Sequence, residues 1–230
     1  MQPPDNFAMM HAGVFRGSFP SKRSLPFMRG LNLRSILYLC PEEPPEYYVQ
    51  FMREHDIAFL HHGLTGNKEP FVEMSDTLVA DAVAELVLAR HQPLYVHCDK
   101  GKHRTGCVIG CYRRMQVRAP SKRAAAERAA TSTRVRARAG AGALSLLVTA
   151  GQPLTLRPQN WSITSIFEEY TRYAGKKGRT FDLQFIELFD TTLVTAAVRK
   201  KQEALRAAEA AEAVGSAVEE IVGRVLRPAV

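Results

Sequence analysis

The chain has 230 residues, of which 46% are apolar, and 31 basic against 23 acidic side chains give it a formal net charge of +8. This size fits one domain of ordinary size with some excess, or two small domains at most. Its four scattered cysteines argue against a disulfide framework, and no stretch approaches the roughly 20 apolar residues that a membrane-spanning helix needs. The first residues show neither the basic flank nor the apolar run of a secretory signal. We therefore expect a cytoplasmic protein, with the nucleus as the alternative compartment.

The positive charge is concentrated in one segment. Residues 117–159 hold eight Lys or Arg and one Glu, which leaves 23 basic and 22 acidic residues in the rest of the chain. This segment also contains no aromatic residue. The basicity therefore describes the segment and not the main surface, and we predict neither a nucleic acid nor a membrane as a partner.

From residue 7 to residue 116 the pattern predicts strands alternating with helices. Short apolar runs indicate buried strands, and helical spacing of apolar residues indicates the segments between them. Ser75 is the expected N-cap of one of these helices. The predicted elements are strand 36–39, helix 45–56, strand 57–60, helix 76–91, strand 94–97 and helix 107–116. Such alternation is typical of an α/β domain with a mainly parallel sheet.

Residues 117–159 interrupt this pattern, because they are rich in Ala, Arg and Gly and show no sustained period. A globular pattern resumes at Asn160, and an Ala/Glu-rich stretch with amphipathic spacing follows. The predicted organisation is one α/β domain formed by residues 1–116 and 160–192, a basic low-complexity insertion at 117–159, and a helical tail at 193–230.

The stretch from His97 to Gly106 carries the chemistry. A cysteine, five residues, an arginine and a hydroxyl residue lie between a predicted strand and a predicted helix. In this setting the backbone N–H groups of the loop form an anion site at the helix N-terminus, and Gly101 permits the tight turn. The arginine, Arg104, can hold two phosphate oxygens at once.

The same positive environment favours the thiolate of Cys98, so that this residue is the expected nucleophile and a phosphocysteine the expected intermediate. The Thr105 hydroxyl is placed to bond the sulfur and assist its departure. The other loop residues, expected to contact substrate, are Asp99, Lys100, Gly101, Lys102 and His103. Cys40, Cys107 and Cys111 lie on apolar elements and are expected to be packed. No metal and no other cofactor is predicted.

These residues resemble the signature of the protein tyrosine phosphatase superfamily. More narrowly, the chain resembles the plant-and-fungal atypical dual-specificity phosphatases over about 3–116 and 160–190. The matching stretches are Pro3–Phe7, Gly13–Arg16, Gly66–Phe71, Gly101–Cys107 and Phe185–Asp190. The resemblance implies a three-layer fold in which helices flank a central, mainly parallel sheet. It also implies removal of the β-phosphate of inositol pyrophosphates, especially at the 5-position, and places Lys68 opposite the cysteine loop.

The residues support this substrate class. Four cationic or cation-capable groups in one short loop suit a ring crowded with phosphates better than a single phosphotyrosine. The stretch 62–71 has Glu69 as its only carboxylate. A weak acid suffices when the leaving group is a phosphate, whose second pKa is about 6, but not when it is a less acidic alcohol. Asp99 departs from the family pattern, and we expect its carboxylate to point outward.

Three functions remain open at this point: an inositol pyrophosphate phosphatase, a protein tyrosine or dual-specificity phosphatase acting on phosphoproteins, and an inactive phospho-binding module. The oligomeric state is not predicted. For residues 117–159 we consider two origins. Codons at both borders are compatible with intron boundaries, which favours a translated, unspliced intron; the alternative is a genuine disordered basic insert.

Overall fold

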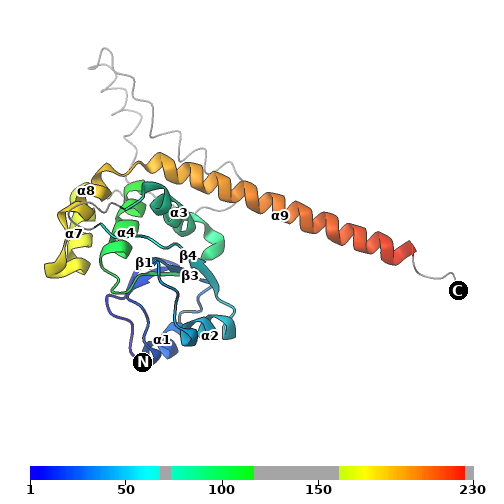
Figure 1. The fold of residues 1–230 in the computed structure, drawn as a ribbon, viewed down its shortest axis with the longest axis horizontal. Coiled ribbons are helices and arrows are strands. Elements are labelled where there is room, and N and C mark those ends of the chain that lie inside the picture. The colour runs from blue at the N-terminus through cyan, green and yellow to red at the C-terminus, as the bar shows by residue number, and fades with distance from the viewer. Residues whose placement is uncertain (68–73, 117–160, 226–230) are drawn as a thin grey trace, which may run out of the picture.

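The structure, a computed structural model, describes residues 1–67, 74–116 and 161–225. Within these residues a five-stranded sheet lies between two helical layers (Figure 1), with the strand order β1-β2-β5-β3-β4. The strands are β1 (Ala8–His11), β2 (Val14–Gly17), β3 (Ser35–Tyr38), β4 (Ala58–His61) and β5 (Leu94–His97). Only β1 is antiparallel to its neighbour. The predicted α/β class with a mainly parallel, helix-flanked sheet is confirmed.

The register of the parallel strands brings three chain segments to one sheet edge. Gly17 of β2 and Tyr38 of β3 both pair with His97, the last residue of β5. The carboxyl ends of β2, β3 and β5 therefore coincide, which is the edge where open α/β sheets carry their sites.

Alternate side chains of the central strands enter two separate cores, because successive residues of a strand point to opposite faces. Ile36 and Tyr95 pack with the layer of α1 and α2, whereas Leu37, Leu94 and Val96 pack with the opposite layer. All five side chains are fully buried. Both faces of the sheet are thus covered, as parallel sheets require.

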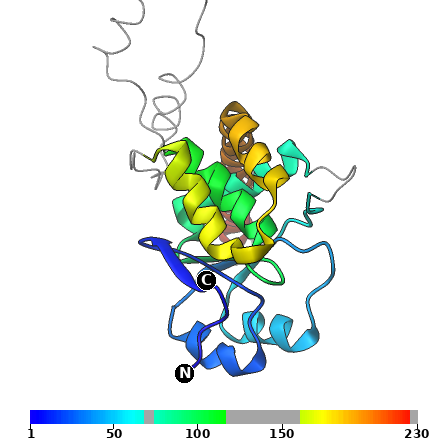
Figure 2. The ribbon, with the colours of Figure 1, turned by 90° about the vertical axis from the view of Figure 1, so that its left-hand side faces the viewer.

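The helices fall into two groups on either side of the sheet (Figures 1 and 2). On one face lie α1 (Leu25–Arg29) and α2 (Glu46–Glu54). The other face carries α3 (Asp76–Val87), α4 (His103–Met115), α7 (Ile163–Ala174), α8 (Thr180–Leu188) and α9 (Thr191–Val225). Short 3-10 turns occur at η1 (Lys22–Ser24), η2 (Ala89–His91) and η3 (Gly175–Lys177).

Some boundaries differ from those expected. The predicted helix 76–91 ends at Val87, because Leu88 adopts an extended backbone and a 3-10 turn follows. Ser75 does precede the helix, but its hydroxyl contacts Thr77 Oγ1 at 3.0 Å and makes no capping bond to the backbone. The helix predicted at 107–116 is α4, which starts at His103, four residues before the predicted start. The β1–β2 hairpin was not predicted.

The N-terminal part of α9 belongs to the core, since Val194 and Val198 are fully buried and α9 packs against α3. Beyond this contact the helix extends away from the sheet and its flanking helices (Figure 1). Among the described residues, no helix has the length and apolarity that crossing a membrane would require.

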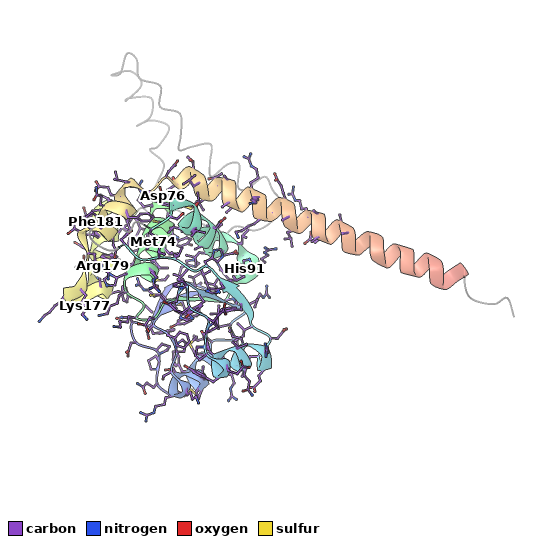
Figure 3. The ribbon with its side chains drawn as sticks, viewed as in Figure 1. Met74, Asp76, His91, Lys177, Arg179 and Phe181 are labelled. Atoms are coloured by element: carbon purple, nitrogen blue, oxygen red, sulfur yellow. The ribbon has the colours of Figure 1, made fainter. Side chains whose placement is uncertain are left out.

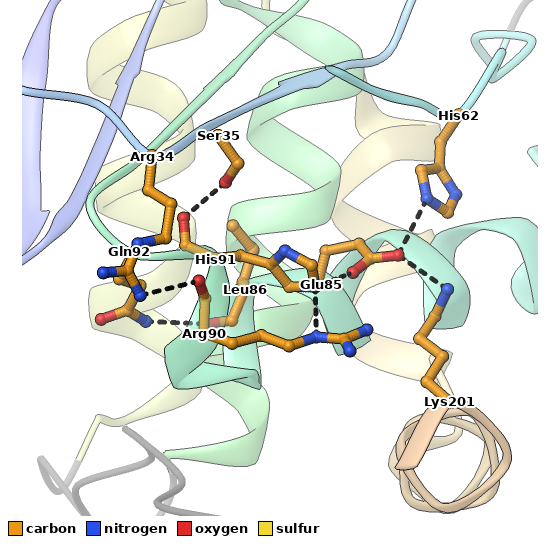
Figure 4. Close-up of polar contacts among 9 residues, drawn as sticks. All are labelled: Arg34, Ser35, His62, Glu85, Leu86, Arg90, His91, Gln92 and Lys201. Atoms are coloured by element: carbon orange, nitrogen blue, oxygen red, sulfur yellow. Dashed lines mark hydrogen bonds and ion pairs between the residues drawn. The ribbon is translucent and has the colours of Figure 1, made fainter. Parts of the chain in front are cut away.

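A cluster of charged and titratable side chains fastens α9 to α3 (Figure 4). The Glu85 carboxylate of α3 is buried and lies 2.7 Å from Lys201 Nζ of α9. His62 Nε2 and His91 Nε2 approach the same carboxylate at 3.4 and 3.0 Å. Burial alone would raise the pKa of Glu85, but these three partners hold it well below its usual value. The cluster is therefore a buried anchor between two helices.

Residues 68–73, 117–160 and 226–230 lie outside the described part of the chain. The predicted insertion 117–159, the predicted substrate contact Lys68 and the candidate acid Glu69 all fall there.

Candidate active site

The loop that begins at Cys98 connects the carboxyl end of β5 to the N-terminus of α4. Cys98 directly follows His97 and is only 5% exposed, and Lys102 is the last residue before α4. The helix starts with a bond from Gly106 N to the Lys102 carbonyl at 2.8 Å. The unpaired N–H groups of the first turn and the positive end of the helix dipole therefore face the region of the thiol.

Three successive carbonyl groups of the loop accept hydrogen bonds from the N-terminal part of the chain, from residues before β1, within β2 and after β2. The acceptors are the carbonyls of Asp99, Lys100 and Gly101, and the bonds come from Phe19 N at 2.9 Å, Asn6 Nδ2 at 2.8 Å and Arg16 Nη2 at 2.9 Å. In a trans peptide the N–H points opposite to the preceding C=O. The N–H groups of residues 100–102 are therefore turned inward, which is the arrangement of an anion-binding nest.

Gly101 is required by this curvature. Its φ of +64° lies in the left-handed region, and an added β-carbon would collide with the carbonyl of Gly17. A residue with a side chain could not bring the loop this close to the end of β2.

His97 supports the start of the loop as a neutral ring. Burial lowers its pKa to about 3. Its Nδ1 lies 3.3 Å from the carbonyl of Cys98, which can only accept, so this nitrogen carries the proton. Its Nε2 then accepts from the hydroxyl of Tyr48 at 3.0 Å. The histidine therefore orients the backbone of the cysteine and stays uncharged at neutral pH.

Arg16 lies fully buried behind the loop. Its guanidinium stacks on the ring of Tyr173, 3.8 Å from the centroid, and donates to Gly101, while Nε and Nη1 find no partner among the described residues. Burial lowers its pKa, whereas Glu169, Tyr173 and Cys98 act in the opposite direction. No local pattern indicates this role beyond the family-like match over Gly13–Arg16.

Asp182 of α8 holds the loop from the other side. Its buried carboxylate accepts from His103 Nδ1 at 3.1 Å, from the Tyr170 hydroxyl at 2.5 Å and from Asn67 Nδ2 at 2.9 Å. Burial alone would raise its pKa, but the bonds from His103, Tyr170 and Asn67 outweigh burial and lower it. An ionised carboxylate here fixes the proton on Nδ1 of His103 and links the cysteine loop to the 62–67 segment.

Arg104 lies beside that same segment. A β-carbon on Gly66 would be 3.8 Å from Arg104 Nε, so the backbone of residue 66 runs directly against the predicted phosphate clamp. Asn67 continues the segment, and its Oδ1 accepts from Met74 N at 2.7 Å, on the far side of residues 68–73.

Cys40 is closer to the chemistry than its predicted role implied. It is buried, as expected, but it follows β3 at the edge where Cys98 follows β5. Burial raises the pKa of its thiol, while Arg104 and a bond from the Asp99 backbone act against this. Cys107 and Cys111 are fully buried, and burial raises the pKa of each well above its usual value.

The loop's other predicted residues occupy different environments. Asp99 and Lys100 are exposed, whereas Lys102 and His103 are half-buried. Thr105 is fully buried, and its hydroxyl makes no hydrogen bond to a described residue, so its contact with the sulfur stays a prediction. Within the described ranges, no three His, Cys, Asp or Glu side chains come together as metal ligands.

Sequence reasoning missed the supports contributed by residues distant along the chain, namely Asn6, Arg16, Asn67, Tyr170, Arg179 and Asp182. None of them lies in the cysteine motif, and only the place of Asn6, Arg16 and Asn67 in the family-like stretches could have drawn attention to them. Two of the helices involved, α7 and α8, pack against α4, the helix that follows the loop (Figure 2).

Comparison with known proteins finds relatives of this chain. The rice (Oryza sativa subsp. japonica) protein named inositol diphosphatase DSP1 is 37% identical over 188 residues, covering 82% of this chain and 65% of the relative. The yeast (Saccharomyces cerevisiae) inositol diphosphatase SIW14 is 34% identical over 189 residues, covering 82% and 52%. This chain thus spans less than two thirds of the length of either relative.

A solved structure shares the fold. The core catalytic domain of the PP-IP phosphatase SIW14 from S. cerevisiae, crystallised with citrate, matches with a TM-score of 0.63 and 30% identity over 87% of this chain and 94% of that chain. The profile described as the tyrosine phosphatase family matches residues 1–119 and 154–208. The first stretch includes the cysteine loop and Arg16, and the second includes Asp182. The chain belongs to the tyrosine phosphatase family.

Proposed function

We propose that this protein hydrolyses the β-phosphate of an inositol pyrophosphate through a phosphocysteine intermediate. The observation that carries the proposal is the loop with three outward-bonded carbonyls, which turns its N–H groups toward the space next to Cys98. The names of the rice and yeast relatives and of the matching catalytic core support the substrate class.

In the first step the Cys98 thiolate attacks the β-phosphorus. A sulfur–phosphorus bond forms, the bond to the bridging oxygen breaks, and that oxygen leaves with the inositol polyphosphate. Arg104 and the inward N–H groups hold the equatorial oxygens, whose negative charge the helix N-terminus also favours. Because the leaving phosphate has a second pKa near 6, it departs without much help from a protein acid.

In the second step water attacks the phosphocysteine. The phosphorus–sulfur bond breaks, inorganic phosphate is released and the thiolate returns. Thr105 is proposed to donate a hydrogen bond to the departing sulfur, which its place in the first turn of α4 favours. His103 and the lysines of the loop, with Lys68, are proposed to bind the other phosphates. The exposed Asp99 carboxylate is proposed to point away from them.

The test is phosphate release from a 5-diphosphoinositol polyphosphate by the purified chain, with a phosphotyrosine peptide measured alongside. We expect fast turnover of the pyrophosphate, slow turnover of the peptide, and loss of both in Cys98→Ser. A thermal unfolding curve of Cys98→Ser that matches the wild type will show that the loss is chemical.

Membership of the tyrosine phosphatase family keeps a protein phosphatase as the second candidate. Faster turnover of the peptide than of the pyrophosphate will establish it in place of the first. Binding of both substrates with turnover of neither, in a folded protein with Cys98 intact, will identify a phospho-binding module.

We also propose that residues 117–159 are not part of the phosphatase domain. The family profile leaves residues 120–153 unmatched, and the flanking parts dock closely: the Arg113 guanidinium lies 4.1 Å from the centre of the Trp161 ring. Transcripts that join the codon of Gln116 to that of Asn160 will support a retained intron. Peptides from the segment in the purified natural protein will refute it. A cytoplasmic location is likewise proposed, supported by four unpaired thiols.

A further inference from the structure

Arg179 is a cation at the candidate site that the cysteine loop itself does not supply. It precedes α8 directly, and its Nη1 donates to the carbonyl of Asn67 at 2.5 Å. Its backbone N–H bonds the hydroxyl of Tyr170 at 3.3 Å. The guanidinium is thus held at one nitrogen and directed at the segment that borders Arg104. Figure 3 labels Arg179 together with Met74, whose backbone N–H bonds the side chain of the same asparagine.

The two arginines share one neighbour. A β-carbon on Gly66 would lie 3.8 Å from Arg104 Nε and 3.8 Å from Arg179 Nη1. These two guanidinium nitrogens are therefore separated by no more than twice this distance. Gly66 itself is buried, so any side chain at this position would enter the space that both groups border.

Arg179 has no acidic partner among the described residues. The carboxylate nearest to it in sequence on α8, Asp182, is occupied by three other donors. Arg179 forms no ion pair within residues 1–67, 74–116 and 161–211, and its side-chain hydrogen bond there goes to a neutral carbonyl. A half-buried guanidinium with one nitrogen anchored and the remaining donors uncommitted is a ready anion ligand, because its planar fork matches two phosphate oxygens.

We propose that Arg179 binds a phosphate of the substrate other than the one transferred to Cys98, and so selects for ligands with several phosphates. The inference rests on the proposed function. Arg104 is committed to the transferred phosphate, and a second guanidinium nearby serves only a molecule that carries a second anionic group. A phosphotyrosine side chain offers none. Arg179 is thus a specificity residue, positioned by Asn67 from outside the cysteine motif.

The experiment compares two substrates, a 5-diphosphoinositol polyphosphate and p-nitrophenyl phosphate, which has a single phosphate. Arg179→Ala removes the charged donor, Arg179→Lys keeps the charge without the fork, and Lys177→Ala is the matched control, because it removes one exposed positive charge two residues away. We expect Arg179→Ala to lower the ratio of the two kcat/KM values about 10-fold to 100-fold, the range for a hydrogen bond to a charged group. Lysine should restore part of that ratio, and Lys177→Ala should leave it unchanged.

A second measurement does not depend on turnover of the pyrophosphate. Inositol hexakisphosphate should inhibit p-nitrophenyl phosphate hydrolysis, and Arg179→Ala should raise its inhibition constant about 10-fold or more. If Arg179→Ala lowers kcat/KM equally for both substrates and leaves the inhibition constant unchanged, the residue only holds Asn67 and the inference is wrong. If the wild type hydrolyses the ester but not the pyrophosphate, the proposed function fails, while the inhibition constants still decide the role of Arg179.

Discussion

The substitution Asp182→Asn tests whether the candidate site depends on α8. Asp182 is fully buried and accepts three hydrogen bonds, of which those from His103 and Tyr170 go to the same oxygen, Oδ2. In asparagine one of the two oxygens becomes an NH2 group, which cannot accept. If the remaining oxygen keeps the bond from Asn67, the variant loses the other two and brings donors against donors.

The magnitude follows from the number of bonds. Removing a hydrogen bond to a charged group costs about 1.5–3 kcal/mol, so two lost bonds amount to about 3–6 kcal/mol in the free energy of unfolding. A domain of this kind has about 5–15 kcal/mol in total. The variant should therefore unfold at a clearly lower urea concentration, and its kcat/KM should fall even where it is folded, because His103 and Asn67 no longer share an acceptor.

The assay is urea unfolding followed by the fluorescence of Trp161, the only tryptophan of the chain, with phosphate release measured in parallel. Asp5→Asn, at an exposed position, is the matched control. Because the pKa of Asp182 is lowered in the folded state, its contribution is present above the unfolded pKa of about 3.9 and is lost as the pH falls below it. The gap between variant and wild type should therefore narrow in acid. An unfolding free energy within about 1 kcal/mol of the wild type at pH 7, with unchanged kcat/KM, will refute this reasoning.

Three further changes have defined outcomes. Gly101→Ala should cost about 2–4 kcal/mol and lower the Tm by about 5 °C or more, because the new β-carbon meets the Gly17 carbonyl at a positive φ; an unchanged Tm would contradict the described loop. Glu85→Gln should lower the free energy of unfolding by about 1–3 kcal/mol in urea at pH 7. Because the pKa of Glu85 is lowered in the folded state, the difference from the wild type should shrink below about pH 4.3. A difference that grows in acid would show that folding raises the pKa of Glu85. Tyr48→Phe leaves Nε2 of His97 buried without a donor and should lower the free energy of unfolding by about 1–3 kcal/mol in the same assay. An unchanged free energy of unfolding would show that this nitrogen is solvated.

Much of the central layer was predictable because its signals are local. The run Leu94–His97 forms the strand expected, and the apolar runs around Ile36 and Ile57 form strands within one residue of their predicted positions. Cys98 lies directly after a strand and Arg104 in the first turn of a helix, because a strand–loop–helix connection with a glycine at residue 101 has few ways to fold. The parallel order of the strands follows from the alternation with helices.

The supports of the site were not predictable from local pattern, because they depend on tertiary proximity. Nothing in the sequence around Asp182 distinguishes a buried carboxylate that holds His103 from an exposed helical aspartate. Arg16 likewise lies on a short strand of mixed polarity, and only the sheet register brings it behind the loop. The hairpin β1–β2 was missed for a related reason: its strands are four residues long and one bulges between Met9 and His11, which obscures the alternation.

The division of the site between two stretches of chain has a consequence for biosynthesis. His103 and its acceptor Asp182 are 79 residues apart, or 36 in a chain without residues 117–159, and the residues between them must be synthesised before the contact can form. At the usual rate of 5–20 residues per second this takes about 2–16 s. During that interval the nascent chain carries the complete cysteine motif without the carboxylate that fixes its histidine. Maturation of the thiol loop is therefore a late event in translation, and a chain that terminates before α8 keeps the recognisable motif but lacks one wall of the site.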